Sequence, residues 1–128
     1  MDIKIKNKGS FVDLISKLIH SRDQIHILHL QSKSYSQHIA LDSYYNGIVG
    51  LVDSLVETYQ GKTKVLLTGY KSYNFSENSD PVTYLTLLKD DVENFRKTLD
   101  FSMDNINNQL QLVVDLIEST VYKLTFLK

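Results

Sequence analysis

Apolar residues recur at spacings of three and four along most of this chain, and this spacing constrains the fold more than any other feature. Such spacing places side chains on one face of an α-helix, which then packs against other helices. The chain has only one proline and five glycines, so few residues interrupt long helices. We therefore predict an all-α fold. Helices are expected at about residues 10–32, 35–60, 80–101 and 104–128.

The ends of these segments carry residues that begin or end helices. Ser10 is expected to cap the first helix, and Asp80 followed by Pro81 is a strong start for the third. Gly61 suits the position just past the end of the second helix. The apolar pattern pauses near residues 102–104. The last two helices are therefore expected to be separate, with one continuous helix as the alternative.

The lengths of the connections indicate how the helices are arranged. The turn near residues 32–34 and the pause near 102–104 are short, which makes the helices that they join antiparallel neighbours. Residues 62–79 instead form a long crossover between the second and third helices. One long crossover in that position is typical of ferritin-like four-helix bundles. We predict one such bundle over residues 10–128, preceded by a flexible basic N-terminal tail over residues 1–9.

Charge and composition exclude several classes of function. The net charge is -1, so no overall field attracts nucleic acid, and the absence of cysteine excludes disulfides and thiolate chemistry. No apolar run is long enough to span a bilayer, so we predict a cytoplasmic protein without a membrane partner. Lys4, Lys6 and Lys8 in the basic tail are the candidate DNA contacts, because lysines neutralise backbone phosphates.

The second predicted helix carries two pairs of potential metal ligands. His38 and Asp42 are four residues apart, and so are Asp53 and Glu57. On a helical wheel all four lie within an arc of about 100°, away from the apolar face of the same helix. Imidazole and carboxylate groups are ligands for iron, manganese and zinc. The stripe is therefore a candidate metal site, with a solvated polar face as the alternative.

The distance between the two pairs decides how such a site is built. Residues 38 and 53 are 15 apart, which corresponds to about 22 Å along a helix, so the pairs cannot hold one metal within one chain. Two antiparallel copies of the helix would bring the first pair of one copy against the second pair of the other. Ile39, Val49 and Val56 lie on the same outward arc, and apolar residues there indicate a covered face. We therefore predict a homo-oligomer, at least a dimer.

These residues resemble a motif of the Dps family, the starvation-protection ferritin-like proteins. Members of that family carry one histidine near the end of the first helix and a second at the start of the second helix. An aspartate follows four residues later, and an Asp and Glu pair lies further along the same helix. The resemblance extends over most of residues 10–127. The matching residues here are His29, His38, Asp42, Asp53 and Glu57.

The resemblance implies a di-iron site that oxidises Fe(II) and is shared between two subunits. His29, His38 and Asp42 would come from one chain, and Asp53 and Glu57 from its neighbour. The resemblance also implies a homo-oligomer that can close into a cage and protect DNA.

Departures from the family pattern leave a second function open. Leu30 follows His29, where the family usually has tryptophan, and the segment from His29 to His38 is shorter than usual. This segment is more similar to bacteriophage-encoded members of the family. The alternative is a phage structural or accessory interaction protein, in the host cytoplasm or the virion, that keeps the bundle without metal chemistry. His20 and His26 are expected to be surface or boundary residues.

Overall fold

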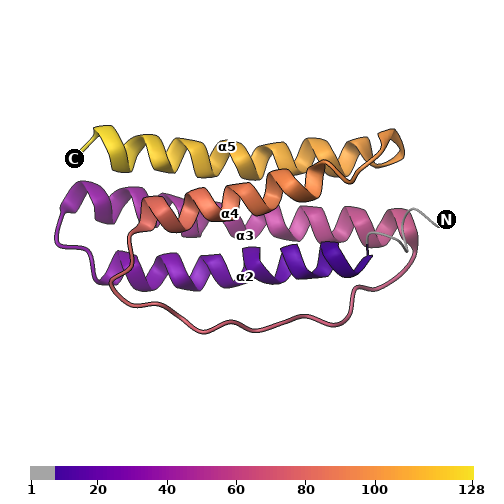
Figure 1. Cartoon of the computed structure of the whole chain (residues 1–128), viewed down its shortest axis with the longest axis horizontal. Coiled ribbons are helices and arrows are strands. Elements are labelled where there is room, and N and C mark those ends of the chain that lie inside the picture. The colour runs from indigo at the N-terminus through magenta and orange to yellow at the C-terminus, as the bar shows by residue number, and fades with distance from the viewer. Residues whose placement is uncertain (1–7) are drawn as a thin grey trace.

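The protein is all-helical in the part of the chain that the computed structural model describes, which is residues 8–128 (Figure 1). This confirms the predicted fold class. No strand occurs among these residues, and none of their helices has the length and apolar character needed to cross a membrane. The elements are α2 (Lys8–Leu30), α3 (Tyr35–Thr63), α4 (Pro81–Arg96), the 3-10 helix η1 (Phe101–Met103) and α5 (Asp104–Phe126).

Two helix ends differ from the sequence-based expectation. Lys8 and Ser10 are both helical residues of α2, so Ser10 is not its cap and Lys8 does not belong to a tail. The helix α3 continues through Gly61 and ends at Thr63, where Lys64 adopts a left-handed conformation with φ 62°. The Lys64 N–H donates to the Gln60 carbonyl, which satisfies a terminal carbonyl of the helix and stabilises the unusual conformation of a non-glycine residue.

The helix starts follow from capping side chains. Ser34 caps α3 by accepting from the Gln37 N–H, and Asp80 caps α4 by accepting from the Thr83 N–H, with Pro81 at the start of the helix as predicted. The last two helices are separate, because α4 ends at Arg96 and α5 begins only at Asp104. The alternative of one continuous helix is therefore wrong.

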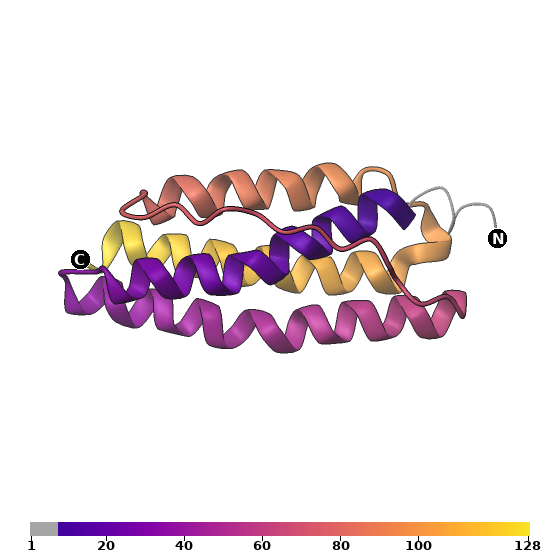
Figure 2. The same cartoon turned by 90° about the horizontal axis from the view of Figure 1, so that it is seen from below.

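The four helices run side by side, and each contacts two others (Figures 1 and 2). The contacting pairs are α2 with α3, α3 with α5, α4 with α5, and α2 with α4. The short link at residues 31–34 makes α2 and α3 antiparallel. The segment 64–80 has no helix or strand and returns along the whole length of the molecule, so α3 and α4 run in the same direction.

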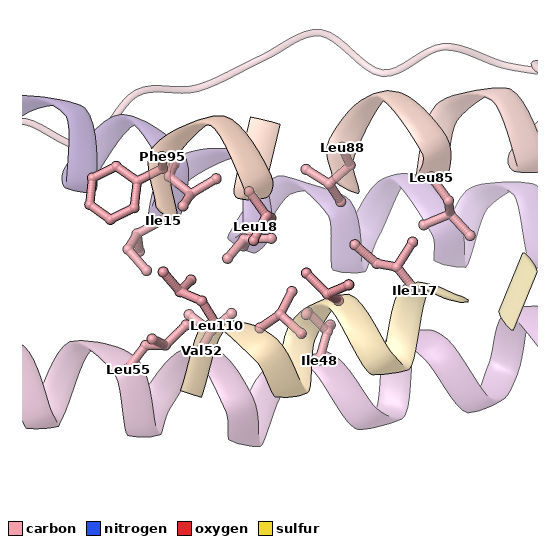
Figure 3. Packing of buried hydrophobic residues seen from close by; sticks show 14 of the residues in the cluster. Ile15, Leu18, Ile48, Val52, Leu55, Leu85, Leu88, Phe95, Leu110 and Ile117 are labelled. Atoms are coloured by element: carbon pink, nitrogen blue, oxygen red, sulfur yellow. The ribbon is translucent and has the colours of Figure 1, made fainter. Parts of the chain in front are cut away.

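A single apolar core lies between the four helices, as Figure 3 shows for part of it. Leu41, Ile48 and Leu55 are at most 1% exposed, which confirms the apolar face predicted for the second helix. Burial of each such side chain contributes about 1.5–3 kcal/mol to stability. The core side chains labelled in Figure 3 are Ile15, Leu18, Ile48, Val52, Leu55, Leu85, Leu88, Phe95, Leu110 and Ile117.

The crossover 64–80 is fixed to α2 by buried polar side chains. The Gln24 side-chain amide donates to the Ser76 carbonyl at 2.7 Å and accepts from the Ser76 N–H at 2.8 Å. Closer to the start of α2, the Ser16 hydroxyl accepts from the Lys71 N–H at 2.9 Å, and the Lys71 ammonium lies 3.0 Å from the Asp13 carboxylate. The crossover backbone thus pairs the donor and the acceptor of the Gln24 side chain. It also donates to Ser16, whose own hydroxyl donates to the Val12 carbonyl of α2, and both residues are at most 2% exposed.

Candidate functional site

His29 and His38 face each other across the short link between α2 and α3. His29 is buried in the last turn of α2, and His38 is partly buried in the first turn of α3. Their rings stack with centroids 3.7 Å apart and planes 24° apart. The Nδ1 atom of His29 lies 2.8 Å from the His38 carbonyl oxygen, and Nδ1 of His38 lies 3.2 Å from the His29 carbonyl oxygen.

This reciprocal pairing fixes the tautomer of both imidazoles. A carbonyl oxygen can only accept a hydrogen bond, so each Nδ1 carries the proton and donates it. In a neutral ring the lone pair then belongs to Nε2, which is the nitrogen that can bind a metal. Metal-binding histidines usually donate their other ring N–H in this way. When neutral, both imidazoles therefore have the tautomer that a metal ligand requires.

Asp42 lies one helical turn after His38, and Tyr45 lies almost one turn after Asp42. Both are partly buried. The nearby Asp42 carboxylate is the main cause that raises the pKa of Tyr45 above its ordinary value. The Tyr45 ring also meets the His29 ring edge-on, with centroids 5.2 Å apart and planes 85° apart.

Sequence reasoning did not assign Tyr45 or His26 to this site. His26 is exposed, in line with its expected surface position, but its ring lies 4.3 Å from the Tyr45 ring and 5.8 Å from the His29 ring. Their spacing in the sequence is the signal that could have identified them. Asp42 and Tyr45 are three residues apart and therefore share a helix face, and the same holds for His26 and His29. We call His29, His38, Asp42 and Tyr45 the imidazole cluster.

Asp53 and Glu57 form a separate exposed pair further along α3. Asp53 lines a groove of about 190 Å³ between α2 and α3, together with Arg22 and Asp23. Within residues 8–128 no three His, Asp, Glu or Cys side chains come together in a group that could hold a metal ion. The two predicted pairs thus lie at different levels of α3 in one chain.

Exposed apolar side chains accompany both pairs on the surface of α2 and α3. Ile39 is 44% exposed and Val49 is 38% exposed, as the helical wheel predicted, and Val56 is partly buried. Ile19 of α2, which is 48% exposed, lines the same groove as Val49 and Asp53. The surface is therefore apolar between its charged residues, a composition typical of protein contact surfaces.

The candidate DNA contacts fall largely outside the described part of the chain. Lys4 and Lys6 precede residue 8, and Lys8 is the first described residue of α2. DNA binding through these lysines stays a prediction.

Comparison with known proteins gives one family. The model of a family of unknown function (DUF5856) matches residues 29–124, which is most of the chain, so the chain belongs to this family. The matched segment contains all five predicted metal ligands, from His29 to Glu57. No curated protein and no solved structure matches the chain.

Proposed function

We propose that this protein is a Dps-like, ferritin-like four-helix bundle that forms a homo-oligomer and binds Fe(II) between its subunits. The arrangement of the helices supports the ferritin-like bundle. All contacting helix pairs are antiparallel, and one long crossover joins α3 to α4 along the length of the molecule.

The observation that carries the proposal is the orientation of His29 and His38. Each Nδ1 is committed to a backbone carbonyl, so each Nε2 keeps its lone pair. Asp42 follows His38 by one turn of α3, but among the described residues of one chain it does not form with the two imidazoles a group that could hold a metal ion, so the proposal needs ligands from a second subunit.

The donor set fits iron. Two neutral imidazoles and the carboxylates of Asp42, Asp53 and Glu57 would give a shared site a formal charge of about −3, which attracts divalent cations. Fe(II) is the substrate and cargo in this proposal. Each ion loses one electron to an external oxidant, such as a peroxide, and becomes Fe(III). The protein's own contribution is to gather the ions and compensate their charge.

Two subunits are needed because one chain separates its ligands. Asp53 is 15 residues from His38 along α3, or about 22 Å. In a two-fold dimer with α3 antiparallel to its copy, the imidazole cluster of one chain meets Asp53 and Glu57 of the other. Exposed Ile39 and Val49 would pack in the same contact.

Anaerobic titration with Fe(II), followed by metal analysis of the separated protein, tests the proposal. Wild-type protein should retain Fe(II), and the variant His38→Ala/Asp42→Ala should retain almost none. The matched control Asp90→Ala/Asp104→Ala removes two exposed carboxylates from other helices and should bind like wild type. If wild type retains no more Fe(II) than the first variant, the metal site is wrong. The alternative of a phage structural or accessory protein would then be favoured.

A further inference from the structure

The outward side of α5 carries large apolar side chains that are exposed in the single chain. Leu112 is 51% exposed, Tyr122 is 53% exposed and Phe126 is 72% exposed. At 100° per residue these three lie with Asp115 and Ser119 within an arc of about 80°, away from the buried residues of the same helix. The rings of Tyr122 and Phe126 lie 5.6 Å apart and form one aromatic patch. Exposed apolar patches of this kind mark contact surfaces.

The residues of this surface follow the same order in both directions from Ser119. Seven positions away on either side are Leu112 and Phe126, which are both apolar, and four positions away are Asp115 and Lys123, which have opposite charges. We call these five residues and Tyr122 the α5 face. The α5 face is complementary to an antiparallel copy of itself. In such a pair each apolar residue meets the other apolar residue, and each charge meets the opposite charge.

The two charged residues are available for that contact. Within residues 8–128 neither Asp115 nor Lys123 forms an ion pair, although the Asp115 carboxylate accepts from the Gln111 side chain at 2.9 Å. The Glu118 carboxylate, by contrast, lies 3.7 Å from the Lys89 ammonium of α4. In a parallel pair of α5 helices each charge would face its own kind. Charge therefore favours the antiparallel copy, which also aligns the helix dipoles favourably.

Ser119 lies at the centre of the α5 face and is exposed. The axes of packed helices are about 8–10 Å apart, and the shorter distances need small side chains where the helices come closest. In a two-fold contact the central residue meets its own copy. A serine at this position therefore allows two α5 helices to approach closely.

We propose that the α5 face is an interface between two copies of this chain, which pack antiparallel around Ser119. This contact uses none of the predicted metal ligands and lies on a different helix from the contact that the proposed function requires. A chain with two different two-fold contacts, one through α3 and one through α5, assembles beyond a dimer.

A single introduced cysteine tests the contact, because the chain has no cysteine of its own. In Ser119→Cys the two thiols would meet at the two-fold axis, where the Cα atoms can reach the separation of about 4.4–6.8 Å that a disulfide needs. Mild oxidation of dilute protein should then give covalent dimers on a non-reducing gel. The matched control is Ser54→Cys, at an exposed serine of α3, which should remain monomeric on the gel.

Charge reversal in the Ser119→Cys protein tests the antiparallel pairing. Asp115→Lys places a cation against Lys123 of the other copy, and Lys123→Asp places an anion against Asp115. Each change should slow the formation of covalent dimers by about 10-fold, since like charges then face each other twice in every contact. The double variant Asp115→Lys/Lys123→Asp exchanges the two charges and should restore the rate. A general loss of structure could not be restored in this way.

Three results would overturn the proposal. Covalent dimers no more frequent in Ser119→Cys than in Ser54→Cys would leave the α5 face to a different protein. Rates that the charge reversals do not change would show collision without a specific contact. Slower rates that the double variant does not restore would contradict the antiparallel pairing. All of these rates are measured without iron, so their failure leaves the proposed iron site standing, and failure of the Fe(II) titration leaves the α5 contact standing.

Discussion

At the scale of single residues, the environment of each histidine determines what its ring can do. His29 and His38 use Nδ1 to bind backbone carbonyls, which leaves Nε2 as the nitrogen with a lone pair. His20 has a different environment, because its ring stacks on Phe75 at 4.8 Å and meets Tyr73 at 5.6 Å. Both aromatic partners belong to the crossover. His20 therefore has a structural role in holding that segment.

The pKa of His20 predicts how stability depends on pH. Burial lowers this pKa below the ordinary value of 6.5, and the nearby Asp23 carboxylate opposes the shift in part. The unfolded chain then binds a proton at His20 more readily than the native protein does. The contribution of His20 to the free energy of unfolding is therefore fully present above about pH 6.5, and it is lost as the pH falls through the lower pKa of the folded protein. Unfolding by denaturant at about pH 7.5 and about pH 5.5 should show this loss.

The control for this prediction is His20→Gln, which cannot titrate in that range. Other groups contribute to the pH dependence of both proteins, so the loss of stability on acidification should be smaller in the variant. An equal loss in the two proteins would contradict the assignment to His20.

At the scale of elements, the crossover is the unusual part of the molecule. Residues 64–80 contain no helix or strand, yet their backbone is held by side chains of α2 at several levels. Gln24 makes the most specific of these contacts, with two hydrogen bonds to the same residue, Ser76. A segment without its own regular hydrogen bonds depends on such anchors for its order.

Replacing Gln24 by alanine should therefore loosen the crossover. The change leaves the Ser76 N–H and carbonyl without their partner and should lower the free energy of unfolding by about 1–3 kcal/mol. Hydrogen exchange followed by mass spectrometry should show faster exchange around residues 71–78, while α5 stays protected. The adjacent exposed residue provides the control, since Asp23→Ala should change stability by less than about 0.5 kcal/mol. Unchanged exchange in the Gln24 variant would show that the anchor is not needed.

The elements also show how far the sequence predicts the structure. The periodicity of apolar residues predicted all four helices and the core face of α3, because burial of apolar area dominates their packing. Asp80 and Pro81 predicted the start of α4, since capping is a local effect. The prediction that α3 ends just before Gly61 was wrong, because the Lys64 N–H donates to the Gln60 carbonyl. This bond stabilises the left-handed backbone conformation of Lys64.

Long-range contacts explain what the sequence did not predict. Gln24 is a buried polar residue of α2 whose partner comes from the folded crossover, and Ser16, which donates to the Val12 carbonyl within the helix, accepts there from the Lys71 N–H. Tyr45 belongs to α3, whereas His26 and His29 belong to α2. Their rings come together only because the chain turns at residues 31–34. Spacing placed His38 and Asp42 on one face, but it could not give the stacking of His29 on His38 at 3.7 Å.

At the scale of the whole molecule, the proposed function requires more than one chain. The imidazole cluster and the pair Asp53 and Glu57 lie at different levels of α3, and no group of three metal ligands forms within residues 8–128. A two-fold contact through the surface that carries Ile39 and Val49 would complete two identical sites at once. Each site would then take His29, His38 and Asp42 from one subunit.

A mixing experiment tests this shared site most directly. One variant, His38→Ala/Asp42→Ala, lacks the first half-site, and the other, Asp53→Ala/Glu57→Ala, lacks the second. Neither should retain Fe(II) alone. When the two are unfolded, mixed equally and refolded, about half of the dimers are mixed, and each mixed dimer has one site with both halves intact. Anaerobic Fe(II) titration should therefore recover about a quarter of the wild-type capacity, whereas a mixture that binds no more than its separate components would contradict a site shared between subunits.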